Sequence, residues 1–152
     1  MVQLTQTVQV TLPYSGQQVL NFLQDPSHIA LIEPHVDSLS QFLQEQGKRY
    51  ALGRGQCMHL PWHGKFEVKL TKHGVFFTMI EGPMSEQYHC GFIITQRSRS
   101  QTLVTHYTEL TLTSWKTLLQ WPIKHHLAKI MQEKMTRLQN IIGKHIALSS
   151  AA

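Results

Sequence analysis

The sequence predicts an α+β domain in which one curved antiparallel sheet packs against a single long helix at the C-terminal end. Between residues 36 and 113, about six strand-like segments follow one another, each joined to the next by a short turn. After Pro122, apolar residues recur at steps of three and four, which places them on one face of a helix. A sheet must bury one face, and only this helix is long enough to cover it.

One strand and two short helices are predicted before these segments. Residues 3–12 alternate between apolar and polar side chains, as a half-buried strand does. Ser15 followed by Gln18 has the pattern of a capping box at the start of a helix. Asp25 before Pro26 marks the start of a second short helix, with a capping carboxylate and a proline in the first turn. With the later segments, the sheet then has about seven strands.

The alternation within the later strands also predicts which side chains face the interior. On the last strand, His106 lies on the more apolar face, together with Val104. Tyr88 shares a face with Phe92 on the preceding strand. We therefore expect His106 and Tyr88 to point into the interior of the domain.

Length and composition indicate one domain, which we place at residues 1–148, followed by a frayed tail at residues 149–152. Cys57 and Cys90 stand apart from each other and from any metal-binding motif, so we expect both to be reduced thiols. The N-terminus has no basic and apolar regions of the kind found in signal peptides. No apolar run approaches the length of a membrane span. These features predict a cytoplasmic protein.

The net charge of +5 arises mainly near the C-terminal end of the chain. Residues 116–144 contain six basic residues and one acid, whereas the two signs nearly balance elsewhere. Lys129, Arg137 and Lys144 would form a basic outer face on the last helix, which is most often a solvated surface. The alternative is peripheral contact with an anionic membrane or an acidic protein. A basic region confined to one helix does not indicate nucleic-acid binding.

The histidines of HLPWHGKF, residues 59–66, are the first candidates for metal ligands. His59 and His63 have the spacing of a helical ligand pair, but Pro61 between them excludes a helix. Further ligands would have to come from other turns, such as Glu81 or Glu86, to satisfy zinc. The adjacent pair His125 and His126 is expected on the helix surface. We therefore predict no metal site and no cofactor.

The order of elements resembles the helix-grip fold of the START-like, or SRPBCC, superfamily. This superfamily includes polyketide cyclases and dehydrases, lipid-transfer domains and Bet v 1-like proteins. The segment DPSHIALIEPHVDSL is similar to one that follows the first helix in bacterial members related to the G-type subunit of carbon monoxide dehydrogenase. Asp25, Pro26, Pro34 and Val36 occupy the matching positions, whereas His35 stands where that subgroup tends to have glycine.

The resemblance implies a cavity between the sheet and the last helix that binds a small apolar or amphipathic molecule, lipid-like or aromatic. Its mouth would lie at the turns HLPWHG, EGPMSE and TSWKTLLQWP, with Trp62 as a gate residue in the first of them. Aromatic and apolar walls with a few polar groups are typical of such pockets. The predicted ligand-binding residues are Arg54, Met58, Trp62, Phe66, Phe77, Tyr88, His106 and Met131.

Two alternatives remain open at this point. One is an enzyme of the cyclase, dehydrase or hydrolase kind, in which His106 and Tyr88 would act on a bound carbonyl compound. The other is a non-enzymatic interaction module that works through the basic face of the last helix. The spacing of the polar residues defines no catalytic triad, so no catalytic residue is assigned.

Overall fold

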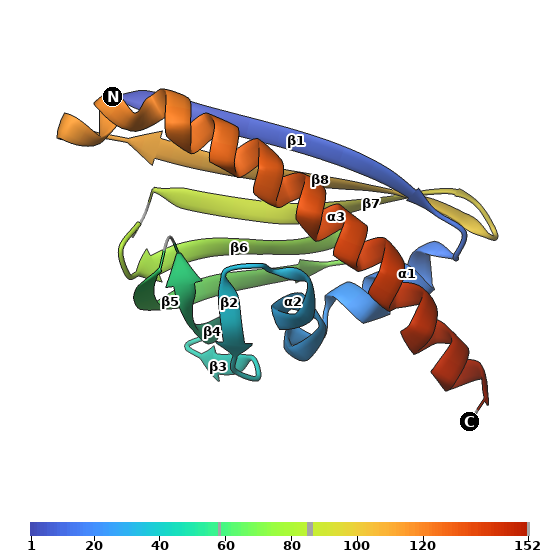
Figure 1. Cartoon of the computed structure of the whole chain (residues 1–152). Helices are drawn as coiled ribbons and strands as arrows, with labels where there is room; N and C mark the ends of the chain where they lie inside the picture. Colours follow the sequence, from blue (N-terminus) through green and yellow to red (C-terminus); the bar gives the residue numbers. More distant parts are fainter. Residues whose placement is uncertain (58, 85–86, 152) are drawn as a thin grey trace.

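The computed structural model describes residues 1–57, 59–84 and 87–151 and shows an eight-stranded antiparallel sheet with helices on one side (Figure 1). Met58 and Glu86, named above, lie outside the described residues. The elements in chain order are β1 (Val2–Leu12), α1 (Gly16–Leu23), α2 (Pro26–Ile32), β2 (Val36–Leu39), β3 (Leu43–Glu45), β4 (Lys48–Cys57), β5 (Leu60–Thr71), β6 (Gly74–Glu81), β7 (Tyr88–Ser98), β8 (Gln101–Leu112), the 3₁₀ helix η1 (Ser114–Leu119) and α3 (Gln120–Ala151).

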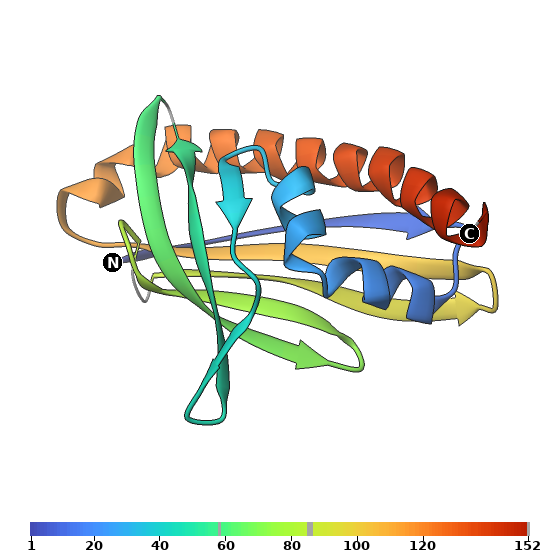
Figure 2. The same ribbon diagram turned by 90° about the horizontal axis from the view of Figure 1, so that it is seen from below.

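The strands lie in the order β1-β8-β7-β6-β5-β4-β2, and the short strand β3 pairs with β4. The strand after the two short helices, β2, is therefore at an edge. Figure 2 shows that the sheet is strongly twisted, with β4 and β5 turned steeply relative to β1 and β8. The helix α3 runs across the concave side of the sheet. This arrangement is the helix-grip fold that the sequence predicted.

The short helices begin where the sequence predicted. The Ser15 hydroxyl accepts a hydrogen bond from the backbone N–H of Gln18, and the Gln18 side chain accepts one from the backbone N–H of Ser15. The Asp25 carboxylate caps α2 by accepting a hydrogen bond from the backbone N–H of Ser27. Because α2 ends at Ile32, Glu33 is its C-terminal cap and leads the chain toward the interior.

A narrow stripe of α3 packs against the sheet. Met131, Met135, Leu138 and Ile142 are buried, and their spacing places them on one side of the helix. Leu127 and Ile130 share the apolar periodicity but are only partly buried, so the stripe begins later than the sequence suggests. None of the helices in the described ranges has the length and apolar character to cross a membrane.

Candidate functional site

The space between the sheet and α3 is occupied by apolar side chains from both layers. Among the predicted ligand-binding residues, Phe66, Phe77 and Met131 lie there and are 7%, 5% and 1% exposed. The rings of Phe66 and Phe77 meet edge to face, with their centroids 6.4 Å apart. These small exposed fractions leave little room for a water molecule beside the three side chains.

A charged network lies within this apolar interior. The ammonium of Lys134, on α3, is 2.8 Å from the carboxylate of Glu33. The same ammonium is 3.4 Å from Nε2 of His106, on β8, while Nδ1 of His106 is 2.8 Å from the carbonyl oxygen of Gly91. The side chain of Lys134 is 3% exposed and that of Glu33 is 11% exposed. The network therefore joins the C-terminal end of α2, the helix α3 and strand β8 of the sheet.

The surroundings of His106 determine its protonation state. Burial, and secondly the positive charge of Lys134, hold the pKa of His106 well below its usual value of 6.5. The ring also stacks on Phe92, with the two centroids 4.2 Å apart. The neutral ring donates a hydrogen bond from Nδ1 to the Gly91 carbonyl and accepts one at Nε2 from Lys134. Because Lys134 occupies the free lone pair, His106 is poorly placed to act as a general base.

Two further hydrogen-bonding groups lie beside this network on β7. Burial, then Cys90 and Glu33, raise the pKa of Tyr88 well above 10, and burial raises the pKa of the Cys90 thiol to about 11. Both groups therefore keep their protons at neutral pH. The buried hydroxyl of Thr108 makes no hydrogen bond within geometric limits to any residue that the structure describes, although it lies close enough to the Tyr88 phenol to lower its pKa slightly against the larger effects. The hydroxyl of Tyr88 and the ammonium of Lys134 are thus hydrogen-bond donors in this part of the interior.

The alternation of apolar and polar residues in β7 and β8 correctly placed His106 and Tyr88 on the inner face, whereas Glu33 and Lys134 were not among the predicted site residues. Lys134 received no role, because a charged residue is rarely buried without a partner. A signal was present in the sequence, since Lys134 stands three residues after Met131 and four before Leu138, within the apolar stripe. Its partner Glu33 is far away in sequence and could not be paired with it by periodicity.

The expectation that Trp62 lies in a loop at a cavity mouth is wrong. Trp62 belongs to β5, which begins at Leu60, and it pairs with Gly55 of β4. Its indole N–H donates a hydrogen bond to the carbonyl oxygen of His35 at 3.0 Å, and its ring meets Phe66 edge to face. The Trp62 ring lies beside Gly53 of β4, where a Cβ would lie 3.4 Å from it, and it packs against the main apolar core.

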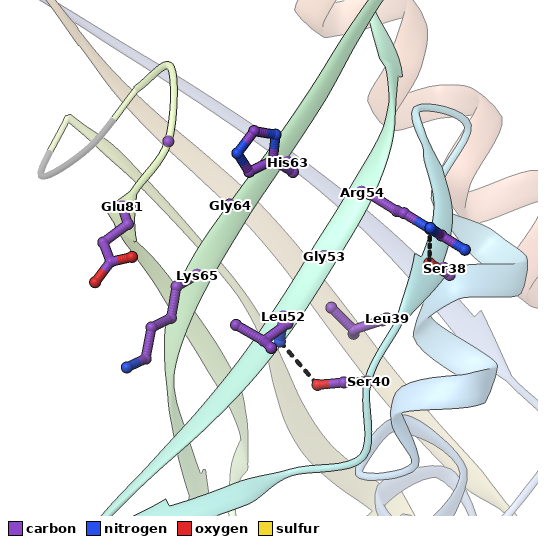
Figure 3. A pocket seen from close by; sticks show the side chains of 11 residues that line it. Ser38, Leu39, Ser40, Leu52, Gly53, Arg54, His63, Gly64, Lys65 and Glu81 are labelled. Carbon is purple, nitrogen blue, oxygen red and sulfur yellow. Dashed lines mark hydrogen bonds between the residues drawn. The ribbon is translucent and has the colours of Figure 1, made fainter.

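Arg54 does not line the interior as predicted. Its side chain is exposed, whereas its neighbours Gly53 and Gly55 are buried, because alternate residues of β4 point to opposite faces. The Arg54 guanidinium donates from Nε to the Ser38 hydroxyl at 3.0 Å. A hollow of about 500 Å³ lies here at the β2, β4, β5 and β6 part of the sheet (Figure 3). Its lining includes Leu52, Arg54, His63, Lys65 and Glu81.

The two histidines first considered as metal ligands are both exposed. His59 lies in the turn before β5 with a φ of 66°, and His63 lies within β5 beside the hollow just described. His126, expected on the helix surface, is instead half-buried. Its Nε2 atom lies 3.3 Å from the Nε2 atom of His35.

Comparison with known proteins identifies the fold. The sequence matches no protein-family model and no curated protein. The structure is similar to a START superfamily protein from Mycobacterium smegmatis (TM-score 0.74, 10% identity, covering 92% of this chain and 97% of that one). It is also similar to TTHA0849 from Thermus thermophilus, with a TM-score of 0.73 and 14% identity, over 98% of this chain and 100% of that one. A third similar structure is the Zhui aromatase/cyclase from Streptomyces sp. R1128, with a TM-score of 0.72 and 12% identity, over 94% of this chain and 93% of that one. The chain thus has the helix-grip fold of the START-like proteins.

Proposed function

We propose that this protein binds one small amphipathic molecule between the sheet and α3, with the polar group of that molecule at Lys134 and Tyr88. The observation that carries this proposal is the Glu33–Lys134–His106 network inside an otherwise apolar interior. The fold supports it, since small-molecule sites are concave and mostly apolar, with a few polar groups that orient the ligand.

A stabilising role alone is a weak explanation for the network. Removing two charges from water costs several kcal/mol per ion, and apolar replacements of a buried ion pair are often neutral or stabilising. Both the ammonium of Lys134 and the phenol of Tyr88 are hydrogen-bond donors, and both interact with the carboxylate of Glu33. A ligand with a carbonyl, carboxylate or sulfonate oxygen would match these donors.

The apolar part of the ligand would lie among methionines. Met79, Met131 and Met135 are buried in the interior, and the flexible, unbranched methionine side chain adapts to irregular shapes. Because these side chains fill the space in this structure, a ligand would have to displace some of them. The likeness to an aromatase/cyclase makes aromatic ligands the first to test. Binding is favoured over base catalysis by His106, whose Nε2 is already bound to Lys134.

The test uses 1-anilinonaphthalene-8-sulfonate, an aromatic probe with an anionic oxygen group, and measures its affinity by calorimetry. Lys134→Met combined with Glu33→Gln removes the cation without leaving an unpaired carboxylate. The loss of one charge-assisted hydrogen bond is expected to weaken binding about tenfold or more. Lys129→Met removes an exposed charge from the same helix and should leave the affinity unchanged.

Glu33→Gln alone should keep most of the binding, because it leaves the ammonium of Lys134 in place. Equal affinity for the wild type and the double variant would refute the proposed site. The proposed site would also be refuted if Lys129→Met weakened the one-to-one binding of the probe as much as the double variant does.

A surface at the start of α3 supports a second function, docking on an anionic membrane. Trp115, Leu118 and Trp121, here called the tryptophan patch, are 68%, 83% and 78% exposed. Trp115 and Leu118 are three residues apart in η1, and side chains at that spacing lie above one another in a 3₁₀ helix. Trp121 follows three residues later, in the first turn of α3. Lys116 lies between Trp115 and Leu118 in the sequence, Lys124 follows Trp121 by three residues, and residues 114–132 contain no acid.

The chemistry of the tryptophan patch matches a lipid surface. Tryptophan is enriched at membrane interfaces because its ring is apolar and its N–H is polar. Each lysine close to an anionic membrane adds roughly 1 kcal/mol of attraction. A membrane would also be a natural source of a hydrophobic ligand. We therefore propose that the tryptophan patch contacts anionic lipid.

Co-sedimentation with phosphatidylcholine vesicles, with and without phosphatidylserine, tests this docking. The protein should sediment with the anionic vesicles and remain in solution with the neutral ones. Trp115→Ser together with Trp121→Ser should abolish sedimentation, whereas Leu52→Ala, at another exposed apolar site, should not change it. Sedimentation that the double substitution leaves intact would contradict the proposal.

A further inference from the structure

Three potential metal ligands from distant parts of the sequence converge at one place. His35 precedes β2, Cys57 is the last residue of β4, and His126 lies in the second turn of α3. One ligand atom from each residue lies within 4.8 Å of the other two, and all three side chains are half-buried. We propose that His35, Cys57 and His126 bind one Zn²⁺ ion. This site shares no residue with the proposed ligand site, and the proposal does not depend on that site.

The distance between the two histidines matches zinc coordination. Their Nε2 atoms are 3.3 Å apart, with the ring centroids 5.3 Å apart. Two nitrogens bound at about 2.0–2.1 Å to a tetrahedral zinc ion lie about 3.3–3.4 Å from each other. A hydrogen bond between two neutral imidazoles has a similar length, so this distance must be weighed with the third ligand and with the surroundings.

Cys57 provides the third ligand. For zinc–sulfur and zinc–nitrogen bonds of about 2.3 and 2.05 Å, the sulfur should lie about 3.6 Å from each nitrogen. The Cys57 sulfur lies within 4.8 Å of one ring nitrogen of each histidine, so a shift of at most about 1 Å brings it to the coordination distance. On binding, the thiol releases its proton to solvent, and the thiolate becomes the ligand.

The position of His35 is fixed by contacts outside the cluster. Its carbonyl oxygen accepts the indole hydrogen bond of Trp62, and its ring is hydrogen-bonded to the backbone of Gln56. A histidine that binds a metal commonly makes such a second hydrogen bond, which orients the ring. Gly55 allows the close approach, because a Cβ at that position would lie 1.9 Å from the His35 carbonyl oxygen.

Zinc is the metal that best fits this donor set. Two imidazoles and one thiolate are borderline-soft ligands that suit zinc, whereas magnesium and calcium prefer oxygen. Three protein ligands leave a fourth position, which a water molecule can occupy. Glu33 and Lys134 are close enough to His35 to interact with its ring electrostatically, and their opposite charges largely offset each other at the site.

The experiment uses untagged protein stripped of metal and titrated with Co²⁺, a spectroscopic substitute for zinc. One equivalent should produce the visible bands of a tetrahedral site and a thiolate-to-cobalt charge-transfer band. Addition of Zn²⁺ should displace the cobalt, and elemental analysis should find one zinc per chain. Zinc should also raise the melting temperature, because it binds the folded state.

Variants of the ligands and of one neighbour distinguish the site from adventitious binding. Cys57→Ser should remove the charge-transfer band. Changing a residue that only orients a metal ligand typically lowers the metal affinity roughly 10- to 100-fold. His126→Gln removes a ligand itself and should lower the zinc affinity by more than that. His125→Gln alters the adjacent exposed histidine and should leave binding unchanged. Circular dichroism checks that each variant is folded. No band in the wild type, or equal affinity in all variants, would overturn the proposal.

Discussion

Lys134→Met is expected to lower the free energy of unfolding by about 3–5 kcal/mol, the usual cost of removing one partner of a buried ion pair. The substitution leaves the Glu33 carboxylate without its 2.8 Å partner, although only 11% of the Glu33 side chain is exposed. It also removes the donor to Nε2 of His106. Urea denaturation at neutral pH measures the loss.

A double-mutant cycle shows whether the unpaired charge is the cause. Adding Glu33→Gln to Lys134→Met replaces the buried carboxylate with a neutral amide, so the double variant should recover much of the lost stability. Lys129→Met, on the exposed side of α3, should change the unfolding free energy by less than about 0.5 kcal/mol. A double variant that is less stable than Lys134→Met would contradict this account.

Leu138→Ala is expected to cost about 2–5 kcal/mol through the lost burial and the cavity that remains. Leu138 is completely buried in the core, on the stripe of α3 that contacts the sheet. Gln139→Ala, at the next and exposed position, controls for effects on the helix itself. The denaturant midpoint should fall strongly for the first variant and hardly change for the second. If Leu138→Ala left the midpoint unchanged, α3 would not hold the sheet as described.

Local patterns in the sequence predicted the elements and the inner faces well, for a physical reason. Strand alternation assigns a face to each residue, so it correctly placed His106 and Tyr88 in the interior. The capping residues Ser15 and Asp25 act within one turn of chain, so the starts of α1 and α2 could also be predicted. These interactions involve residues that are close together in sequence.

Contacts between distant segments were not predictable in the same way. Periodicity gives the direction of a side chain but not what it will meet, so the pairs Glu33–Lys134 and His35–His126 were missed. The same applies to Arg54: the prediction that it lines the pocket is wrong, because it alternates on β4 with two buried glycines and points to the opposite face.

The segment HLPWHG shows how proline and glycine can mislead. Both residues are typical of a loop, but Gly64 lies inside β5, next to a shift in register at Lys65 and Phe66. A Cβ on Gly64 would lie 2.7 Å from the carbonyl oxygen of Glu81. Gly64 therefore does not mark a turn. It permits the close approach of β6 at a bulge in β5.

The pairing of the first strand with the last has a consequence for the order in which the protein forms during synthesis. β1 leaves the ribosome first, but its hydrogen-bonded neighbour is β8, with Val2 opposite Leu112 and Leu12 opposite Thr102. Until β8 has been made, β1 is an unpaired edge that could join another chain. Only then can α3, which follows β8 in the chain, cover the completed sheet. Such long-range pairing slows folding, so the nascent chain passes through a period of exposure that the finished domain does not have.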